Sequence, residues 1–192
     1  MIQILALTSA LLNLVATGIY LTQIIKNKST PNPSTWMIWV SINTINTATY
    51  FAVVDKNIWI ALASLISAVV AVLIFSTSLF KGKFTNLNRI DVVSLVVAIG
   101  VGLFWKVSSN AVVSNVALQT VFVISFLPTI NGLFIKAARE RPVPWVLGTI
   151  AYVLQIFIVL LNPVSLWALT FPLVQIIGQG IIALLAFRQD GF

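Results

Sequence analysis

The segment that decides the fold is STWMIWVSINTINTATYF, residues 34–51, an apolar run with polar groups near its middle. Its aromatic and amide residues recur at steps of three and four, namely at Trp36, Trp39, Asn43, Asn46 and Tyr50. Residues at this spacing lie along one face of an α-helix. Because amide side chains are costly to expose to lipid, we expect this face to point into a bundle of helices.

The composition of the whole chain is that of an integral membrane protein. Of its 192 residues, 59% are hydrophobic and 8% are charged, and the mean hydropathy is +1.06. A soluble domain carries about 25% charged residues. We therefore predict an all-α integral membrane fold, with the lipid bilayer as its surroundings.

The residue types that are missing restrict the chemistry. The chain has neither cysteine nor histidine, so it lacks the usual ligands of zinc and other transition metals. We expect no metal site, no cofactor and no enzymatic activity, because no acid, base or thiolate pair falls inside an apolar run. The net charge is +7, but the basic residues lie between the apolar runs, so we expect no nucleic-acid partner.

Seven apolar runs are long enough to cross a bilayer, which takes about 20 residues. They cover residues 2–25, 34–54, 57–80, 90–106, 111–135, 143–161 and 165–187. Nine lysines and arginines fall on one side of such a bundle: Lys26, Lys28, Lys81, Lys83, Arg89, Lys136, Arg139, Arg141 and Arg188. Lys56 and Lys106 fall on the other side. Because basic loops stay inside the cell, this split predicts an outside N-terminus and a cytoplasmic C-terminus.

The second and sixth runs resemble each other at a constant separation of 109 residues. A proline, a tryptophan and two polar or amphipathic residues recur in order, first as Pro33, Trp36, Asn43 and Asn46 and then as Pro142, Trp145, Tyr152 and Gln155. We interpret this as a parallel repeat of three, one and three helices. The first triple-helix repeat is predicted at residues 1–84, a linker helix at 85–109 and the second triple-helix repeat at 110–192.

The predicted functional site is a pocket between the two repeats, near the middle of the membrane. The residues that we expect to line it are Trp39, Asn43, Asn46, Ser67, Tyr152, Gln155, Gln175 and Gln179. The amides suit hydrogen bonding to a solute, and the aromatic rings offer flat faces to a sugar or a heteroaromatic ring. The alternative role for the same amides is to join helices, worth about 0.6 to 2 kcal/mol each.

The loop TQIIKNKSTPNPS, residues 22–34, resembles the first loop of the SWEET and PQ-loop (MtN3-like) membrane transporters. In those proteins a Pro-Gln or similar pair ends the first helix, and here Gln23 holds the place of the glutamine. The basic turn that follows the pair is matched by Lys26, Lys28, Ser29 and Thr30. In the second repeat Pro128 keeps the proline. The resemblance implies the three, one, three plan, an outside N-terminus and hinge roles for Gln23 and Pro128.

We therefore expect a facilitator that moves a small uncharged, sugar-like solute by exposing one site alternately to the two sides of the membrane. Two alternatives stay open: a vitamin or nucleoside carrier of the nicotinamide riboside transporter type, and a non-transporting membrane subunit that binds a partner protein. A homo-oligomer is compatible with the sequence as well. The acidic residues fall at span ends or in loops, at Asp55, Asp91, Glu140 and Asp190. Because coupled carriers usually hold a carboxylate or histidine within the membrane, we expect uncoupled transport.

Overall fold

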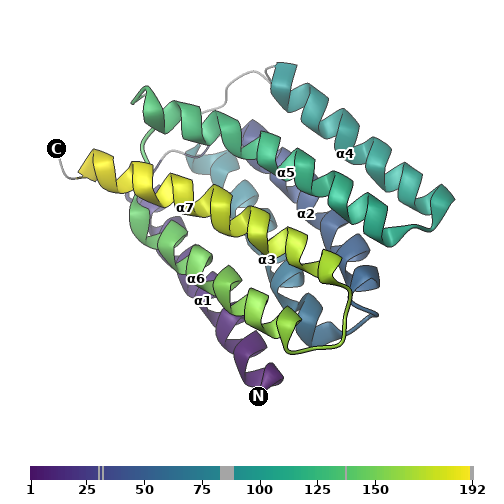
Figure 1. Cartoon of the computed structure of the whole chain (residues 1–192). Helices are drawn as coiled ribbons and strands as arrows, with labels where there is room; N and C mark the ends of the chain where they lie inside the picture. The colour runs from purple at the N-terminus through teal and green to yellow at the C-terminus, as the bar shows by residue number, and fades with distance from the viewer. Residues whose placement is uncertain (30, 32, 83–88, 137, 191–192) are drawn as a thin grey trace.

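The computed structural model describes residues 1–29, 31, 33–82, 89–136 and 138–190. Two residues of the predicted basic loops, Thr30 and Lys83, and the predicted boundary after residue 84 lie outside the described residues, as do the side chains of Asp91 and Asp190. Over the described residues the chain forms seven α-helices and one short 3-10 helix (Figure 1). They are α1 (Ile2–Ile25), α2 (Pro33–Val53), α3 (Ile58–Lys81), α4 (Arg89–Ser108), α5 (Ala111–Phe134), α6 (Pro142–Leu160), η1 (Leu166–Leu169) and α7 (Thr170–Asp190).

The predicted all-α fold class is confirmed. Each apolar run coincides with a helix to within one or two residues, except the last, whose first turn is the separate helix η1. Asparagines fix where two helices begin, because an amide oxygen can accept hydrogen bonds from free N–H groups of the first turn. The Asn57 side chain accepts from the backbone of Trp59 and Ile60 at the start of α3. Asn110 accepts from the backbone of Val113 at the start of α5.

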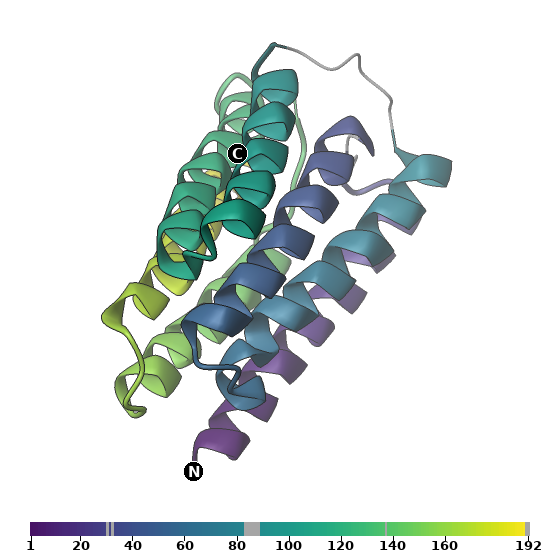
Figure 2. The ribbon, with the colours of Figure 1, turned by 90° about the vertical axis from the view of Figure 1, so that its right-hand side faces the viewer.

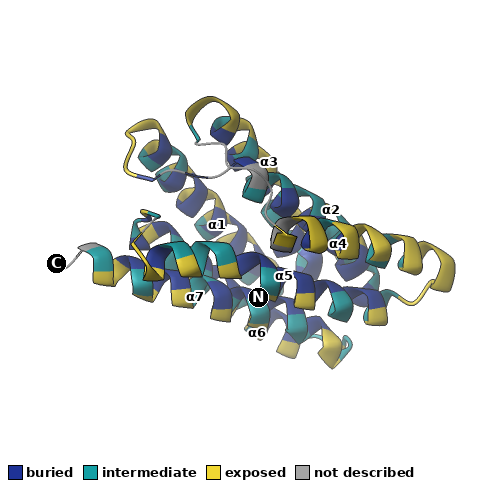
Figure 3. Ribbon diagram, turned by 90° about the horizontal axis from the view of Figure 1, so that it is seen from above, coloured by how far each residue is buried: buried dark blue, intermediate teal, exposed yellow. Residues whose placement is uncertain are grey.

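Among the described residues, five segments are long and apolar enough to cross a membrane: α1, α3, α5, α6 and η1 together with α7. By length and composition these five segments are candidate membrane spans, which agrees with the sequence prediction. The polar residues of α2 lower its hydropathy, and the described apolar part of α4, Val92–Ser108, is shorter. That the five candidate spans, and also α2 and α4, cross a membrane stays a prediction. Exposed residues follow the outer faces of the helices, above all on α4 (Figure 3), where they include Val93, Val96 and Leu103.

Six of the described helices pack side by side into a closed ring. Around the ring, α1 contacts α3, α3 contacts α2, α2 contacts α5, α5 contacts α7, α7 contacts α6, and α6 contacts α1. The helix α4 lies outside the ring against α2 and α5 (Figure 2). Apolar residues fill much of the interior, with Tyr50, Phe122 and Phe171 fully buried.

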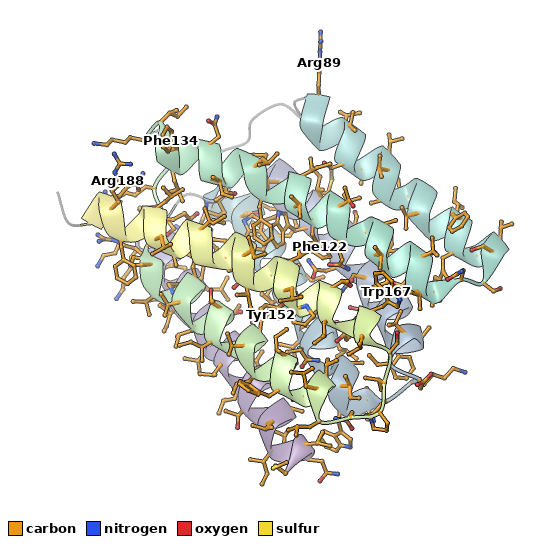
Figure 4. The ribbon with its side chains drawn as sticks, in the orientation of Figure 1. Arg89, Phe122, Phe134, Tyr152, Trp167 and Arg188 are labelled. Atoms are coloured by element: carbon orange, nitrogen blue, oxygen red, sulfur yellow. The ribbon has the colours of Figure 1, made fainter. Side chains whose placement is uncertain are left out.

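The two ends of the bundle differ in charge. Successive helices alternate in direction, so α1, α3, α5 and α7 all end at the same side, which also holds the start of α4. We call this side the basic end, and its described residues include Lys26, Lys28, Lys81, Arg89, Lys136, Arg139, Arg141 and Arg188. Figure 4 shows Arg89 and Arg188 at the ends of α4 and α7 that lie away from Trp167.

Candidate functional site

A cavity lies inside the ring, between α1, α2 and α3 on one side and α6 and α7 on the other. We call it the inner cavity. Its volume of about 70 Å³ is several times the roughly 10–15 Å³ that one water molecule needs. Pockets that hold drug-sized ligands measure roughly 300–1,000 Å³. The inner cavity therefore has room for a few water molecules, and a larger solute requires the helices to move apart.

Most of the residues predicted for the site lie on the wall of this cavity. Six of the eight line it: Trp39, Asn43, Ser67, Tyr152, Gln175 and Gln179. They come from two helices of the first half of the chain and two of the second. Among the described lining residues, none carries a charged side chain. The wall is therefore uncharged and combines polar and aromatic side chains with aliphatic ones such as Val70 and Ile74.

Three polar side chains form a chain of hydrogen bonds along the wall. The hydroxyl of Tyr152, which lies on α6 near the centre of the bundle (Figure 4), donates to Oγ of Ser67 on α3 at 3.2 Å. Ser67 in turn donates to Oδ1 of Asn43 on α2 at 2.7 Å. Nδ2 of Asn43 donates to the backbone oxygen of Trp39 at 2.8 Å. Because each bond orients the next, this chain fixes the donors and acceptors of one wall.

The wall formed by α7 carries an amide with an unused hydrogen-bonding atom. Nε2 of Gln179 donates to Oε1 of Gln175 at 3.2 Å. Nε2 of Gln175 is buried and has no hydrogen-bond partner within the described part of the protein. A buried donor without a partner costs about 1–3 kcal/mol. Gln175 also lines the inner cavity, so this donor belongs to a side chain of the cavity wall.

Asn46, which was predicted to line the site, lies instead in a buried amide cluster between α2 and α5. Its Oδ1 accepts hydrogen bonds from Nδ2 of Asn115 and Nε2 of Gln119, both at 3.0 Å. Three residues turn a helix by about 300°, so Asn43 and Asn46 diverge by about 60° and meet different neighbours. The structure gives Asn46 the contacts of a helix-joining amide.

Gln155 also lies away from the inner cavity, toward the end of the ring opposite the basic end. Its Nε2 donates to the backbone oxygen of Ile60 at 2.6 Å, which joins α6 to the start of α3. The Tyr50 hydroxyl donates to the backbone oxygen of Ala168 at 3.0 Å, which joins α2 to η1. The ring of Tyr50 packs on Phe171 with centroids 5.1 Å apart. We call this set of contacts the distal seal, because it lies between the inner cavity and that end.

The helix α1 contributes residues that the sequence analysis did not assign to the site. Asn13, Thr17 and Tyr20 line the inner cavity. Their steps of four and three place them on one helical face. That stripe is visible in the sequence, and it could have been chosen by the same reasoning that selected the residues of α2.

The predicted hinge residues lie nearer the basic end. Pro128 lies within α5. Gln23 lies in the last turn of α1, where its backbone oxygen accepts hydrogen bonds from the N–H groups of Lys28 and Ser29 at 2.8 and 3.3 Å. Neither Gln23 nor Pro128 is among the described residues that line the inner cavity. Their hinge roles stay predictions.

A second cavity, which we call the outer cavity, lies toward the basic end and has a volume of about 130 Å³. Four aromatic residues, Tyr20, Trp36, Trp39 and Trp145, line both cavities. Their side chains therefore form a wall between the two, and we call it the aromatic wall. Glu140, in the loop between α5 and α6, lines the outer cavity and is buried.

The carboxyl group of Glu140 has an unusual acidity for its residue type. Burial raises its pKa to about 7, and the hydrogen bonds from Tyr20 and Trp145 oppose part of that rise. Burial acts in this direction because the charged carboxylate loses the water that would solvate it. Glu140 therefore changes its charge near neutral pH.

The comparisons with known proteins add no assignment to this geometry. No family model, curated protein or solved structure matches the chain. The site therefore has to be interpreted from its own residues. They form an uncharged cavity with polar, aromatic and aliphatic side chains, between helices from both halves of the chain.

Proposed function

We propose that the chain is a membrane facilitator that moves a small uncharged polar solute, sugar-like in chemistry, by alternating access. The observation that carries this proposal is the uncharged lining of the inner cavity, to which Gln175, with its partnerless Nε2, belongs. The hydrogen-bond chain from Tyr152 to Asn43 lies on another wall of the same cavity. An uncharged lining suits an uncharged solute, because a buried ion needs an opposite charge to offset its lost hydration.

The pattern of helix contacts supports two similar halves. If α1 is exchanged with α5, α2 with α6 and α3 with α7, every pair of neighbouring helices in the ring becomes another pair of neighbours in the ring. The contact of α1 with α3 becomes that of α5 with α7, and the contact of α1 with α6 becomes that of α5 with α2. This is the pattern expected of a parallel repeat. We therefore propose the repeats at residues 1–84 and 110–192, joined by the linker helix at 85–109.

The two ends of the cavity suit a pathway that opens on one side at a time. The distal seal lies on one side of the inner cavity, and the aromatic wall lies on the other. We place the basic end in the cytoplasm, because basic loops are retained there. In this orientation the N-terminus is outside, the aromatic wall closes the cytoplasmic side and the distal seal closes the outer side. Sliding or rocking of one repeat against the other opens either side alone.

A vitamin or nucleoside carrier is the second candidate, and the aromatic lining favours it. Five aromatic residues line the inner cavity: Tyr20, Trp36, Trp39, Trp145 and Tyr152. Flat rings stack well on heteroaromatic bases, with a gain of about 0.5–1.5 kcal/mol per pair beyond the buried area. The sequence resemblance allows this candidate too, since nicotinamide riboside transporters share the repeat plan. Both candidates use the same cavity and differ in the solute.

Thermal stabilisation of the purified protein tests the proposal. A panel of uncharged sugars, nucleosides and vitamins is compared with charged analogues, namely sugar phosphates and nucleotides. A ligand at 100 times its Kd stabilises the folded state by about 2.7 kcal/mol, so we expect one uncharged class to raise the melting temperature and its charged analogue to leave it unchanged. Stabilisation by a nucleoside alone selects the second candidate. If none of the compounds stabilises the protein, both candidate functions are contradicted and a non-transporting subunit is supported.

A further inference from the structure

Glu140 is a buried carboxylate that holds two side chains of the aromatic wall. Its Oε1 accepts a hydrogen bond from the hydroxyl of Tyr20 at 2.9 Å. Its Oε2 accepts one from Nε1 of Trp145 at 3.4 Å. The side chain is 6% exposed. The sequence placed Glu140 only at the end of a span, where a carboxylate is usually solvated, so the burial is information that the structure adds.

The aromatic wall joins helices from both halves of the ring. The ring of Tyr20 on α1 lies 5.9 Å from Trp36 on α2 and 5.9 Å from Trp145 on α6, between centroids. Trp36 packs on Trp39 at 5.8 Å. Tyr20 therefore links α1 to α2 and α6 at this level, and its hydroxyl is bound to Glu140. One carboxylate thus fixes the part of the wall where the two proposed repeats meet.

We propose that Glu140 is the latch of a gate at the basic end of the solute pathway: it holds Tyr20 and Trp145 between the two cavities, and its protonation favours the closed gate. The inference rests on the proposed function for what passes through the gate. The latch itself is a property of the wall and can be measured without a solute. Glu140 acts here through Tyr20 and Trp145, so it is a positioning residue.

The other groups near Glu140 leave it as the titrating group of the gate. Tyr20 on α1, Trp145 on α6 and Ser29 in the loop before α2 face its carboxyl group. The described residues of α2 and α5 on the outer cavity carry no titratable group, namely Thr35, Trp36, Trp39, Pro128 and Thr129. Arg139 and Arg141 flank Glu140 in the chain. Arg139 is exposed, and Arg141 lines a separate surface pocket with Lys26 and Lys28.

The direction of the pH effect follows from the two environments of the carboxyl group. In the closed wall, burial raises the pKa of Glu140 from 4.5 to about 7. In the open gate, water reaches the carboxyl group and its pKa returns toward the ordinary value. The closed state therefore binds the proton more tightly than the open state, so acid stabilises closure and alkaline pH favours opening. The change falls between these two pKa values and is nearly complete by about pH 8.

The absence of cysteine from the chain makes access to the inner cavity measurable with one introduced thiol. Ala71→Cys places a thiol on the wall of the inner cavity. Arg188→Cys places an exposed thiol at the basic end. Its labelling rate is the reference that corrects for the change of thiol reactivity with pH. Each purified variant reacts in detergent with a water-soluble maleimide. We expect the ratio of the two labelling rates to rise on the order of tenfold between about pH 5.5 and 8.

Two further variants separate a latch from a merely structural contact. Glu140→Gln resembles the protonated side chain, so we expect a low ratio of labelling rates at every pH. Tyr20→Phe removes the hydroxyl that donates to Glu140 and keeps the ring, so we expect the ratio at pH 5.5 to rise. Thr8→Val also removes a hydroxyl from α1, but an exposed one that donates to the backbone oxygen of Ile4 and lines neither cavity. This control is expected to keep the pH profile of the parent protein.

The outcomes distinguish the latch from the proposed function. If the ratio of labelling rates does not change with pH while Glu140 is present, the latch is overturned. The latch is also overturned if the ratio rises equally with pH in the Glu140→Gln variant. The first of these two tests uses the protein with Glu140 unchanged, so it remains decisive even if the Glu140→Gln variant fails to fold. If the labelling ratio rises with pH as expected but no compound of the panel stabilises the protein, the latch stands and the proposed solute facilitator is contradicted. A flat profile in a protein that binds a solute contradicts the latch alone.

Discussion

At the scale of single residues, the buried amides fall into two groups with opposite roles. Gln175 lines the inner cavity and has a donor that no described group satisfies, whereas Gln119 donates to Asn46 in the cluster between α2 and α5 and lies away from the inner cavity. A hydrogen bond is worth about 0.5–1.5 kcal/mol net. Gln175→Leu should therefore weaken binding of the stabilising solute by up to about tenfold and leave the melting temperature unchanged or raised.

Gln119→Leu is the matched control for this prediction. It removes a donor from Asn46, so we expect a lower melting temperature and an unchanged Kd for the solute. Calorimetric titration gives the two affinities, and a thermal scan without ligand gives the two melting temperatures. Equal losses of affinity in both variants would show that Gln175 acts through the fold rather than through the solute.

The same scale shows what the sequence could predict of the site and what it could not. The spacing of Trp39 and Asn43 placed them on an inward face, and both line the inner cavity. The spacing did not separate Asn43 from Asn46, because a face about 60° wide can meet two neighbouring helices. Glu140 was assigned to a loop, and its burial depends on how the loop folds over Tyr20. Helical periodicity carries no information about such a contact.

At the scale of helices, the contact between α2 and α5 depends on the amide cluster. Oδ1 of Asn46 accepts two hydrogen bonds, so Asn46→Leu deprives buried donors of their acceptor. We expect the free energy of unfolding to fall by about 1–3 kcal/mol. Thr44→Val is the control on the same helix, since the Thr44 hydroxyl is exposed and donates to the backbone of Val40 within α2. Denaturation in mixed micelles measures both variants, and an equal loss at Thr44 would argue against the cluster.

Two glycines on α7 offer a matched test of its packing against α5. A Cβ added at Gly178 would collide with the ring of Phe126, whereas one added at Gly180 meets nothing within 4 Å. Gly178→Ala should lower the free energy of unfolding by about 1–3 kcal/mol through overpacking. Gly180→Ala should raise it by about 0.5–1 kcal/mol, because glycine is a poor residue inside a helix. Equal changes in thermal or denaturant unfolding at both positions would contradict the close approach of α7 to Phe126.

At the scale of the whole molecule, the positive-inside pattern gives an orientation that can be measured. Lys26 and Arg188 lie at the basic end, and Lys106 lies at the other end, at the close of α4. Single cysteines at these positions, treated in intact cells with an impermeant maleimide, should react only at position 106. The physical reason is that basic loops are retained in the cytoplasm. Reaction at position 26 or 188 instead would show that the bundle has the opposite orientation in the membrane.

The helices were predictable from the sequence at this scale, but their arrangement was not. Apolar runs of about 20 residues broken by asparagine, proline and lysine define seven helices almost residue by residue. The order of helices around the ring depends on side-chain fit between neighbours, such as Gly148 on α6, where an added Cβ would collide with the amide of Gln179 on α7. A single sequence holds the residues of such a contact but not the pairing. The repeat of 109 residues predicts two similar halves, which stays a prediction, and it does not give the positions of their helices.

The central claim is that an uncharged solute equilibrates through the inner cavity. The measurement that tests it most directly is uptake of the stabilising compound, radiolabelled, into proteoliposomes with and without proton and sodium gradients. Because Glu140 lies at one end of the pathway and not at the cavity itself, pH should change the rate of uptake and not its final level. We predict the same equilibrium level under all conditions, reached more slowly with Gln175→Leu. Accumulation above equilibrium that collapses with either gradient, or no uptake of a compound that stabilises the protein, would contradict the account.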